Sequence, residues 1–289
     1  MALGRKVAWT VGAAAALALH PGWTPAAPAA PAQTASVRVT YGLWLGGLPL
    51  GSADMVTAVD GASYTLNLQA RLTGLAGMIT GGKGAASASG SAAGGQPAPY
   101  SFNVLSQTSS DRRTVRVGFS GGAANAVEIA PPLEERSDRV PVLPPHKRGV
   151  VDPLSAVLMP VAGRGEPTDP QNCNRTVPVF DGASRFDVIL AYAETRQVEK
   201  PGYSGPVLVC NVRYRPVSGH RPDRPAVRYM EENRDMWVWL APVEGTRVLI
   251  PMRISVATTM GVSLVEATRW AVEGAAGPTA RVGRGPSRE

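Results

Sequence analysis

The most regular hydrophobic pattern of the chain lies near its C-terminus, in residues 236–270. Three runs rich in β-branched and aromatic residues are separated there by residues 242–245 and 260–261, which is typical of a three-stranded antiparallel meander. Trp237 and Trp239 fall on one face of the first strand. Alternate positions of the second strand are also apolar: Ile250, Met252, Ile254 and Val256. We therefore expect a sheet with at least one strongly apolar face.

The same two-residue alternation recurs in the first half of the chain. Asp60-Gly61 predicts a tight hairpin turn, because these residues tolerate the positive φ that such turns need. The predicted strands cover residues 36–46, 52–59, 63–72, 100–107, 114–119 and 126–129, and, in the second half, 177–180, 184–194 and 206–214. Residues 213–230 are rich in Arg and Pro and predict an exposed loop. The sequence thus predicts a mainly β protein.

Residues 74–95 are dominated by Gly, Ala and Ser, so they predict either a weak, bent strand or a mobile loop. Gly77, Gly82 and Lys83 match the opening of a phosphate-binding loop. Gly84 stands where that motif needs Ser or Thr, and no helix-forming sequence follows. The sequence therefore argues against nucleotide binding here.

Asp152-Pro153-Leu154-Ser155 is the clearest helix start in the chain. Asp152 suits the N-cap and Pro153 suits the first helical position, where no N–H donor is needed. Leu158 follows Leu154 at i+4, and Pro160 ends the helix within about two turns. We expect a short helix whose apolar side covers the sheet. A catalytic acid at Asp152 is the alternative, and the proline beside it favours the capping role.

The N-terminal residues 1–32 have the three parts of a secretory signal peptide: Arg5 and Lys6, an apolar run, and an A-x-A site at residues 30–32. The apolar run is too short for a transmembrane helix, which favours cleavage over an uncleaved anchor. We expect export to the periplasm, with no membrane span in the mature chain. Residues 33–271 are predicted to form one β domain, with a boundary between two halves near 131–150. Residues 272–289 are predicted to be a disordered tail.

Two cysteines occur in the chain, Cys173 and Cys210. In an exported protein two cysteines most simply form one disulfide, and their spacing is not that of a redox pair. Loss of residues 1–32 lowers the net charge from +7 to +5, because Arg5 and Lys6 leave with no acid. This excess is spread along the chain, so nucleic-acid binding is not expected.

Candidate chemistry is sparse. His146 and His220 lie in separate loops without a second histidine at metal-binding spacing. Glu231, Glu232 and Asp235 form an acidic group, but neighbouring carboxylates in a charged loop are usually solvated. We expect no cofactor, no metal and no catalytic residues, and therefore not an enzyme.

Several motifs, in order, resemble the domain of unknown function family 3108 (DUF3108), a family of exported bacterial proteins. They are residues 41–43 with Gly51, Gly94 with Pro97 and Tyr100, residues 152–155, 179–182, 239–241 and 250–254, and Gly261. The resemblance covers residues 36–270. It implies an envelope protein built on a curved antiparallel sheet, a half-barrel or open barrel, and the one short helix predicted at Asp152 would cover that sheet. It implies no catalytic residues.

Two hypotheses for function remain open. The first is a carrier whose concave sheet face binds an apolar ligand such as a lipid. Its candidate lining is Trp44, Leu66, Leu68, Trp237, Trp239 and Ile254. These side chains also suit an ordinary core, which is the commoner role of large apolar residues. The second hypothesis is an envelope protein that holds a partner protein through a sheet edge or the Arg-rich loop. Hydrolysis is a remote third alternative.

Overall fold

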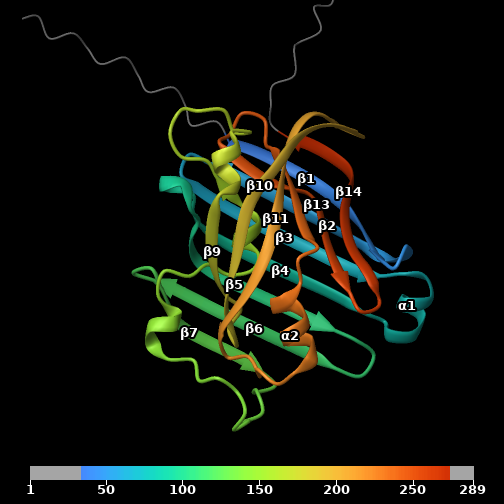
Figure 1. The fold of residues 1–289 in the computed structure, drawn as a ribbon, viewed down its shortest axis with the longest axis vertical. Coiled ribbons are helices and arrows are strands. Elements are labelled where there is room, and N and C mark those ends of the chain that lie inside the picture. The colour runs from blue at the N-terminus through green and yellow to red at the C-terminus, as the bar shows by residue number, and fades with distance from the viewer. Residues whose placement is uncertain (1–33, 274–289) are drawn as a thin grey trace, which may run out of the picture. The chain divides into compact units, whose positions relative to one another are not determined.

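The computed structural model describes residues 34–273. These residues form a mainly β structure, as the alternating pattern predicts (Figure 1). The strands are β1 (Thr34–Leu45), β2 (Leu48–Asp60), β3 (Ser63–Leu72), β4 (Lys83–Ser91), β5 (Ala98–Gln107), β6 (Arg112–Ser120), β7 (Ala123–Ala130), β8 (Met159–Pro160), β9 (Arg175–Phe180), β10 (Arg185–Lys200), β11 (Tyr203–Ser218), β12 (Met236–Pro242), β13 (Val248–Thr258) and β14 (Gly261–Glu273). The α-helices are α1 (Gly74–Thr80) and α2 (Pro225–Glu232), and the 3-10 turns are η1 (Ala93–Gly95), η2 (Pro144–Lys147), η3 (Ser155–Val157) and η4 (Pro170–Cys173).

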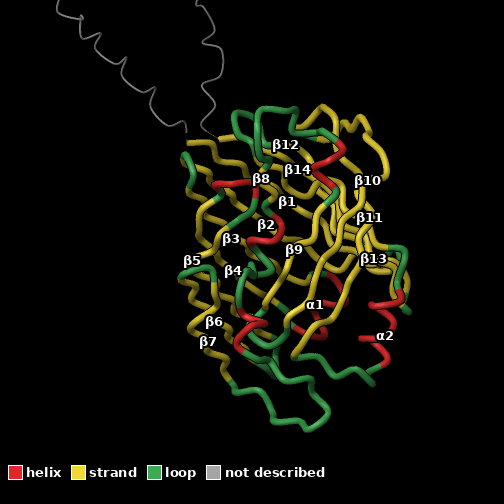
Figure 2. The backbone as a smooth tube through the Cα atoms, turned by 60° about the vertical axis from the view of Figure 1, so that its left-hand side comes forward, coloured by secondary structure: helices red, strands yellow, loops and turns green. Residues whose placement is uncertain are grey.

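The strands form one antiparallel sheet in the order β7-β6-β5-β4-β3-β2-β1-β14-β13-β12-β11-β10-β9, with β8 paired to β13. The sheet curls so that β9, β10 and β11 cross in front of β3 to β6 (Figure 1). Residues 148–151 connect its two edge strands, because Arg148 bridges to Ala123 of β7 and Val151 bridges to Val179 of β9. The result is a nearly closed barrel, seen from a second direction in Figure 2.

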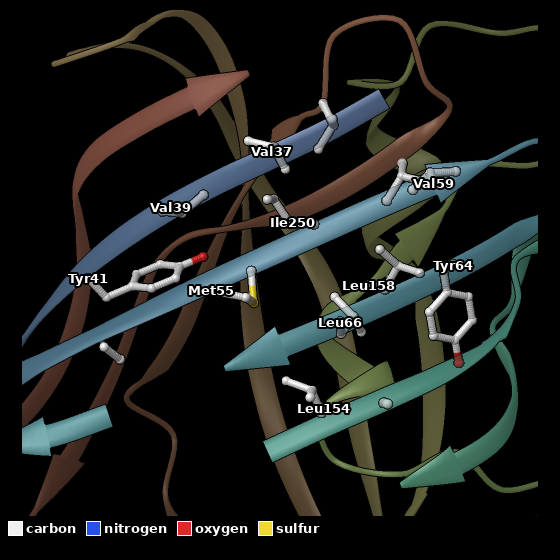
Figure 3. Close-up of a cluster of buried hydrophobic side chains, with 14 of the residues drawn as sticks. Val37, Val39, Tyr41, Met55, Val59, Tyr64, Leu66, Leu154, Leu158 and Ile250 are labelled. Carbon is white, nitrogen blue, oxygen red and sulfur yellow. The ribbon is translucent and has the colours of Figure 1, made fainter. Parts of the chain in front are cut away.

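Alternation along each strand separates the inner from the outer face of the barrel. Val37, Val39 and Tyr41 of β1 are buried and point inward, together with Met55 of β2 and Leu66 of β3 (Figure 3). Burial of such side chains stabilises the fold by roughly 1.5–3 kcal/mol each. The core therefore lies inside the curled sheet.

The segment around the predicted Asp152 helix has a different form and place from those expected. Residues 150–161, here called the inner segment, hold only one 3-10 turn, η3. Leu154 and Leu158 of this segment are buried among the inward side chains of β1 to β4 (Figure 3). The turn ends early because Met159 and Pro160 pair with Leu249 and Val248 of β13. The segment fills one end of the barrel from within, whereas the sequence predicted a two-turn helix over the sheet.

Two α-helices occur where the sequence predicted strand or loop. Residues 74–95 form α1, β4 and η1, and residues 213–230 continue β11 before forming most of α2. Pro225 occupies the first turn of α2, where its missing N–H costs nothing. Composition alone pointed to loop because charged and proline residues dominate this stretch. The expectation of a single covering helix is therefore wrong.

The predicted signal peptide and C-terminal tail lie outside the described residues, apart from residues 272 and 273, which end β14. Within the described part of the chain, no helix has both the length and the apolar character needed to cross a membrane.

Candidate functional site

The six residues predicted to line a ligand face do not share one face of the sheet. Leu66 is fully buried in the core, while Leu68 and Ile254 are half-buried on the inner face. Trp44 lies on the outer face of β1, where its ring covers Gly42 so closely that a Cβ there would overlap it.

The inner position of Ile254 follows from the register of five strands. Directly opposite residues in neighbouring strands share a face of the sheet. One such row runs Leu43, Val265, Ile254, Val238 and Cys210. Leu43 is two positions from the buried Tyr41, so the whole row faces inward.

The two tryptophans of β12 lie on the opposite face from Val238, because they alternate with it along the strand, and they lie beside a β-bulge of β13. Trp239 pairs with Arg253 and Leu240 with Pro251, so Met252 is the extra residue of the bulge. Such an insertion re-aims the side chains that follow it. Met252 is buried in the core, whereas Arg253 points outward over the Trp239 ring, 5.1 Å from its centroid.

The outer tryptophans are held by polar partners. Arg196 of β10 also lies over the Trp239 ring, 5.2 Å from its centroid. Arg253 in addition forms an ion pair with Glu266 at 3.6 Å. Trp237 donates from Nε1 to the Asp235 carboxylate at 2.7 Å. These residues therefore form a cation–π and ion-pair cluster at the edge of the main buried core, against which Trp239 packs.

An apolar recess opens at the end of the barrel beside α1. Its volume is about 300 Å³. Its lining includes Leu43, Ala70, Leu72, Gly82, Gly84 and Ser106. Arg71, Lys83 and Gln107 border it at the strand ends. We call this feature the α1-end recess.

Further half-buried apolar side chains lie on the inner wall beyond the residues that line the recess. On the β3 to β6 side they are Leu68, Val104 and Val115, and on the opposite side Val188, Val212 and Ile254. The fully buried side chains form two clusters, one that includes Val37, Tyr41 and Leu66 and one around Cys173 and Cys210, and all six half-buried residues pack at the edges of these clusters. The interior is thus tightly packed around the inner segment and looser toward α1.

The inner segment carries a buried polar network. Asp152 Oδ1 accepts hydrogen bonds from the backbone N–H groups of Leu154 at 2.9 Å and Ser155 at 2.8 Å, which is the capping role predicted for it. Tyr64 of β3 donates its hydroxyl to Ser155 Oγ at 2.7 Å. These bonds fasten the segment to the barrel wall.

Asp152 is completely buried, and its second oxygen, Oδ2, has no hydrogen-bond partner. Burial raises the pKa of the Asp152 carboxyl, and hydrogen bonds from Ser155 and Leu154 oppose this only in part. Burial likewise raises the pKa of the Tyr64 hydroxyl. Because a substrate would have no access to this carboxyl, the arrangement supports a structural role over an acid catalyst.

Cys173 and Cys210 form the predicted disulfide, with their Cα atoms 5.7 Å apart. The bond joins η4 to the inward row of β11. It links positions 37 residues apart, which corresponds to about 4 kcal/mol of stabilisation on the chain-entropy model. The disulfide therefore anchors the loop that follows the inner segment.

The remaining polar candidates lie on different elements. His146 Nδ1 accepts from the Leu143 backbone N–H at 3.2 Å, and Asp235 binds Trp237. Glu231 and Glu232 lie at the end of α2. Among residues 34–273, no three His, Cys, Asp or Glu side chains gather as a metal site would require.

Comparisons with known proteins give a family for this chain. The crystal structure of a beta-barrel-like protein of the domain of unknown function DUF1849 from Brucella abortus is similar at 11% sequence identity and a TM-score of 0.49, over 85% of this chain and 100% of that one. No curated protein matches the sequence. The family described as "Protein of unknown function (DUF3108)" matches residues 36–268, and the chain therefore belongs to that family.

Proposed function

We propose that the protein is a non-catalytic carrier of the cell envelope that binds an apolar ligand, such as an acyl chain, in the α1-end recess. The observation that carries the proposal is the uneven packing of the barrel interior. At one end the inner segment buries Leu154 and Leu158 almost completely. Toward α1, Leu43, Leu68 and Ile254 face inward but stay half-buried.

Incomplete burial has a free-energy cost that a ligand would remove. Apolar surface withdrawn from water contributes roughly 25 cal/mol per Å². Interiors are normally packed as densely as organic crystals, so a wall of half-covered valines and leucines is unusual inside a barrel. An acyl chain lying against Leu68, Val104 and Ile254 would complete that packing.

The size and the rim of the recess indicate the class of ligand. Its volume of about 300 Å³ is at the lower limit of small-molecule pockets, roughly 300–1,000 Å³. Arg71 and Lys83 border it, and neither forms an ion pair within the described part of the chain. An amphiphile with one acyl chain and an anionic head group matches this combination.

The alternative of partner binding through the Arg-rich loop or a sheet edge has less support. Three arginines of that region already pair with acids: Arg215 with Asp187, Arg221 with Asp138 and Arg228 with Asp223. The two edges of the sheet are bridged by Arg148 and Val151. Both features reduce what these surfaces offer to a partner.

Titration with a dansyl-labelled fatty acid tests the proposal. Ala70→Trp places an indole in the recess and should weaken binding at least about tenfold, because it competes for the same volume. Ala85→Trp is the matched control, since Ala85 is exposed on the outer face of β4, one pairing position from Ala70. Saturable binding to the wild type and control, lost in Ala70→Trp, is expected.

Circular dichroism of both variants should show that the barrel is folded. If folded wild-type protein binds no dansyl fatty acid, or if Ala70→Trp binds it as well as the control does, the carrier proposal is wrong.

A further inference from the structure

Four large apolar side chains are exposed at the α1 end of the barrel: Leu48 (70% exposed), Met78 (83%), Met260 (73%) and Val262 (45%). We call this group the apolar rim. Exposed apolar side chains scattered singly need no explanation. Here, however, four of the eight large exposed hydrophobic residues of the described chain lie at one end. Such concentration is typical of an interaction surface.

The apolar rim is assembled from three segments that lie side by side. The turn between β1 and β2 contacts the turn between β13 and β14, where the Gly46 N–H donates to the Val262 carbonyl at 3.0 Å. Gly261 allows this approach, because it has φ +106° and a Cβ there would lie 2.8 Å from the Gly46 Cα. The two turns therefore present Leu48 and Met260 together.

Helix α1 joins the same end. The N–H of Thr73, just before the helix, donates to the carbonyl of Leu50 in β2 at 2.8 Å. The helix returns to the sheet where the Leu72 N–H donates to the Gly82 carbonyl at 2.8 Å. Leu72 and Gly82 also line the α1-end recess. The helix and both turns are adjacent in Figure 1, so the apolar rim borders the mouth of the recess.

A row of cations runs across the neighbouring strand ends. Arg71 pairs with Lys83, Lys83 with Gln107, and Gln107 with Arg112, which is followed by Arg113. All four basic residues are exposed, and none forms an ion pair within residues 34–273. Two acids lie near this row: Asp111 in the adjoining turn, and Asp54 of β2, which lines a surface groove together with Arg71 and Lys83. Four basic residues against these two acids leave this end of the barrel with a net positive charge.

We propose that the apolar rim docks the protein on an anionic lipid bilayer. Apolar side chains that enter the interface, together with basic residues that face anionic head groups, are the two contributions that hold proteins reversibly at membranes. In this orientation the mouth of the α1-end recess faces the lipid, so that an acyl chain can pass between bilayer and barrel. The role of docking in ligand transfer rests on the proposed carrier function. The docking surface itself is inferred from the exposure of the apolar rim and from the positive charge beside it.

Vesicle flotation tests the docking surface. The wild type should float with vesicles of phosphatidylglycerol and phosphatidylcholine in equal parts, and much less with phosphatidylcholine alone. The double substitution Leu48→Glu with Met260→Glu should reduce the bound fraction at least about tenfold, because it replaces both turn tips by anions. The control is Leu143→Glu with Tyr192→Glu, which changes two exposed apolar residues elsewhere and should float like the wild type.

The contribution of charge is tested by Arg112→Ser with Arg113→Ser. Basic residues near an anionic surface contribute roughly 1 kcal/mol each, so binding should fall about tenfold or more. No flotation of the wild type, or equal loss in the Leu48/Met260 variant and its control, would overturn the inference. So would a wild-type dimer that the Leu48/Met260 variant dissociates without any vesicle binding, since the rim would then be a self-association surface.

Dansyl fatty acid binding in vesicle-free solution separates this inference from the carrier function. The Leu48/Met260 variant should keep wild-type affinity for the probe, because neither residue lines the recess. Probe binding without flotation would refute docking and leave the carrier standing. Flotation without probe binding would refute the carrier and leave docking standing.

Discussion

Leu158→Ala measures how much the inner segment contributes to the fold. Leu158 is 1% exposed and packs in the cluster that includes Leu66 and Tyr64 (Figure 3). Removing its isobutyl group loses the transfer free energy of the buried carbons and leaves a cavity that the surrounding strands cannot fully close. Such truncations cost roughly 2–5 kcal/mol, and the dense surroundings here favour about 3 kcal/mol.

Denaturant unfolding, followed by tryptophan fluorescence with the disulfide intact, measures this change. A loss of about 3 kcal/mol should also lower Tm by roughly 6–12 °C in a domain of this size. Leu143→Ala is the control, because Leu143 is 53% exposed in the loop before the inner segment. Exposed substitutions usually stay within about 0.5 kcal/mol of the wild type. A Leu158→Ala variant as stable as the control would show that the inner segment does not pack inside the barrel.

Three further predictions concern the groups that hold the inner segment and its loop. Replacing Cys173 and Cys210 by alanine should cost about 4 kcal/mol in urea unfolding, and an unchanged midpoint would contradict this. Tyr64→Phe should cost about 1–3 kcal/mol by leaving the Ser155 hydroxyl without its buried partner; calorimetry showing no fall in Tm would refute the network. Burial raises the pKa of Asp152 above 3.8, so the folded state binds this proton more tightly than the unfolded state, and stability falls as pH rises from about 3.8 through the folded pKa. Asp152→Asn should remove that slope, and parallel stability–pH curves for the two proteins would contradict it.

The strands were largely predictable from sequence because each has one apolar face. Two-residue alternation in residues 36–46 and 63–72 depends on local burial, and the structure places β1 and β3 there. Antiparallel neighbours joined by short turns then give most of the sheet order. The closure of the barrel could not be predicted from alternation, because it depends on residues 148–151, which bridge to two strands that are distant in sequence.

The Asp152 motif was recognised from sequence, but its position was not. Asp-Pro-Leu-Ser encodes a capped turn through local hydrogen bonds, and those bonds are present. Whether the turn lies over a sheet or inside it depends on Tyr64, which lies 91 residues away from Ser155. Periodicity carries no signal for such a contact.

The candidate site was predicted only in part. Parity places Leu68 and Ile254 on apolar faces, and both are inward. Trp239 does not share the face of Ile254, because Ile254 lies opposite Val238, and this register follows a bulge at Met252 that alternation does not reveal. The recess beside α1 was missed because it depends on which end of the barrel the inner segment fills. The alternation of Leu68, Ala70 and Leu72 runs unbroken to the end of β3, and this was the one available signal.

The central proposal is that the protein carries an acyl-chain amphiphile in the α1-end recess. Native mass spectrometry of periplasmic material, purified without detergent, tests it most directly. Wild-type protein and Ala85→Trp should each show an added mass that fragments to an acyl-chain lipid, and folded Ala70→Trp should lack it. Wild-type protein found only at its unliganded mass, or Ala70→Trp carrying the same lipid as the wild type, would contradict the account.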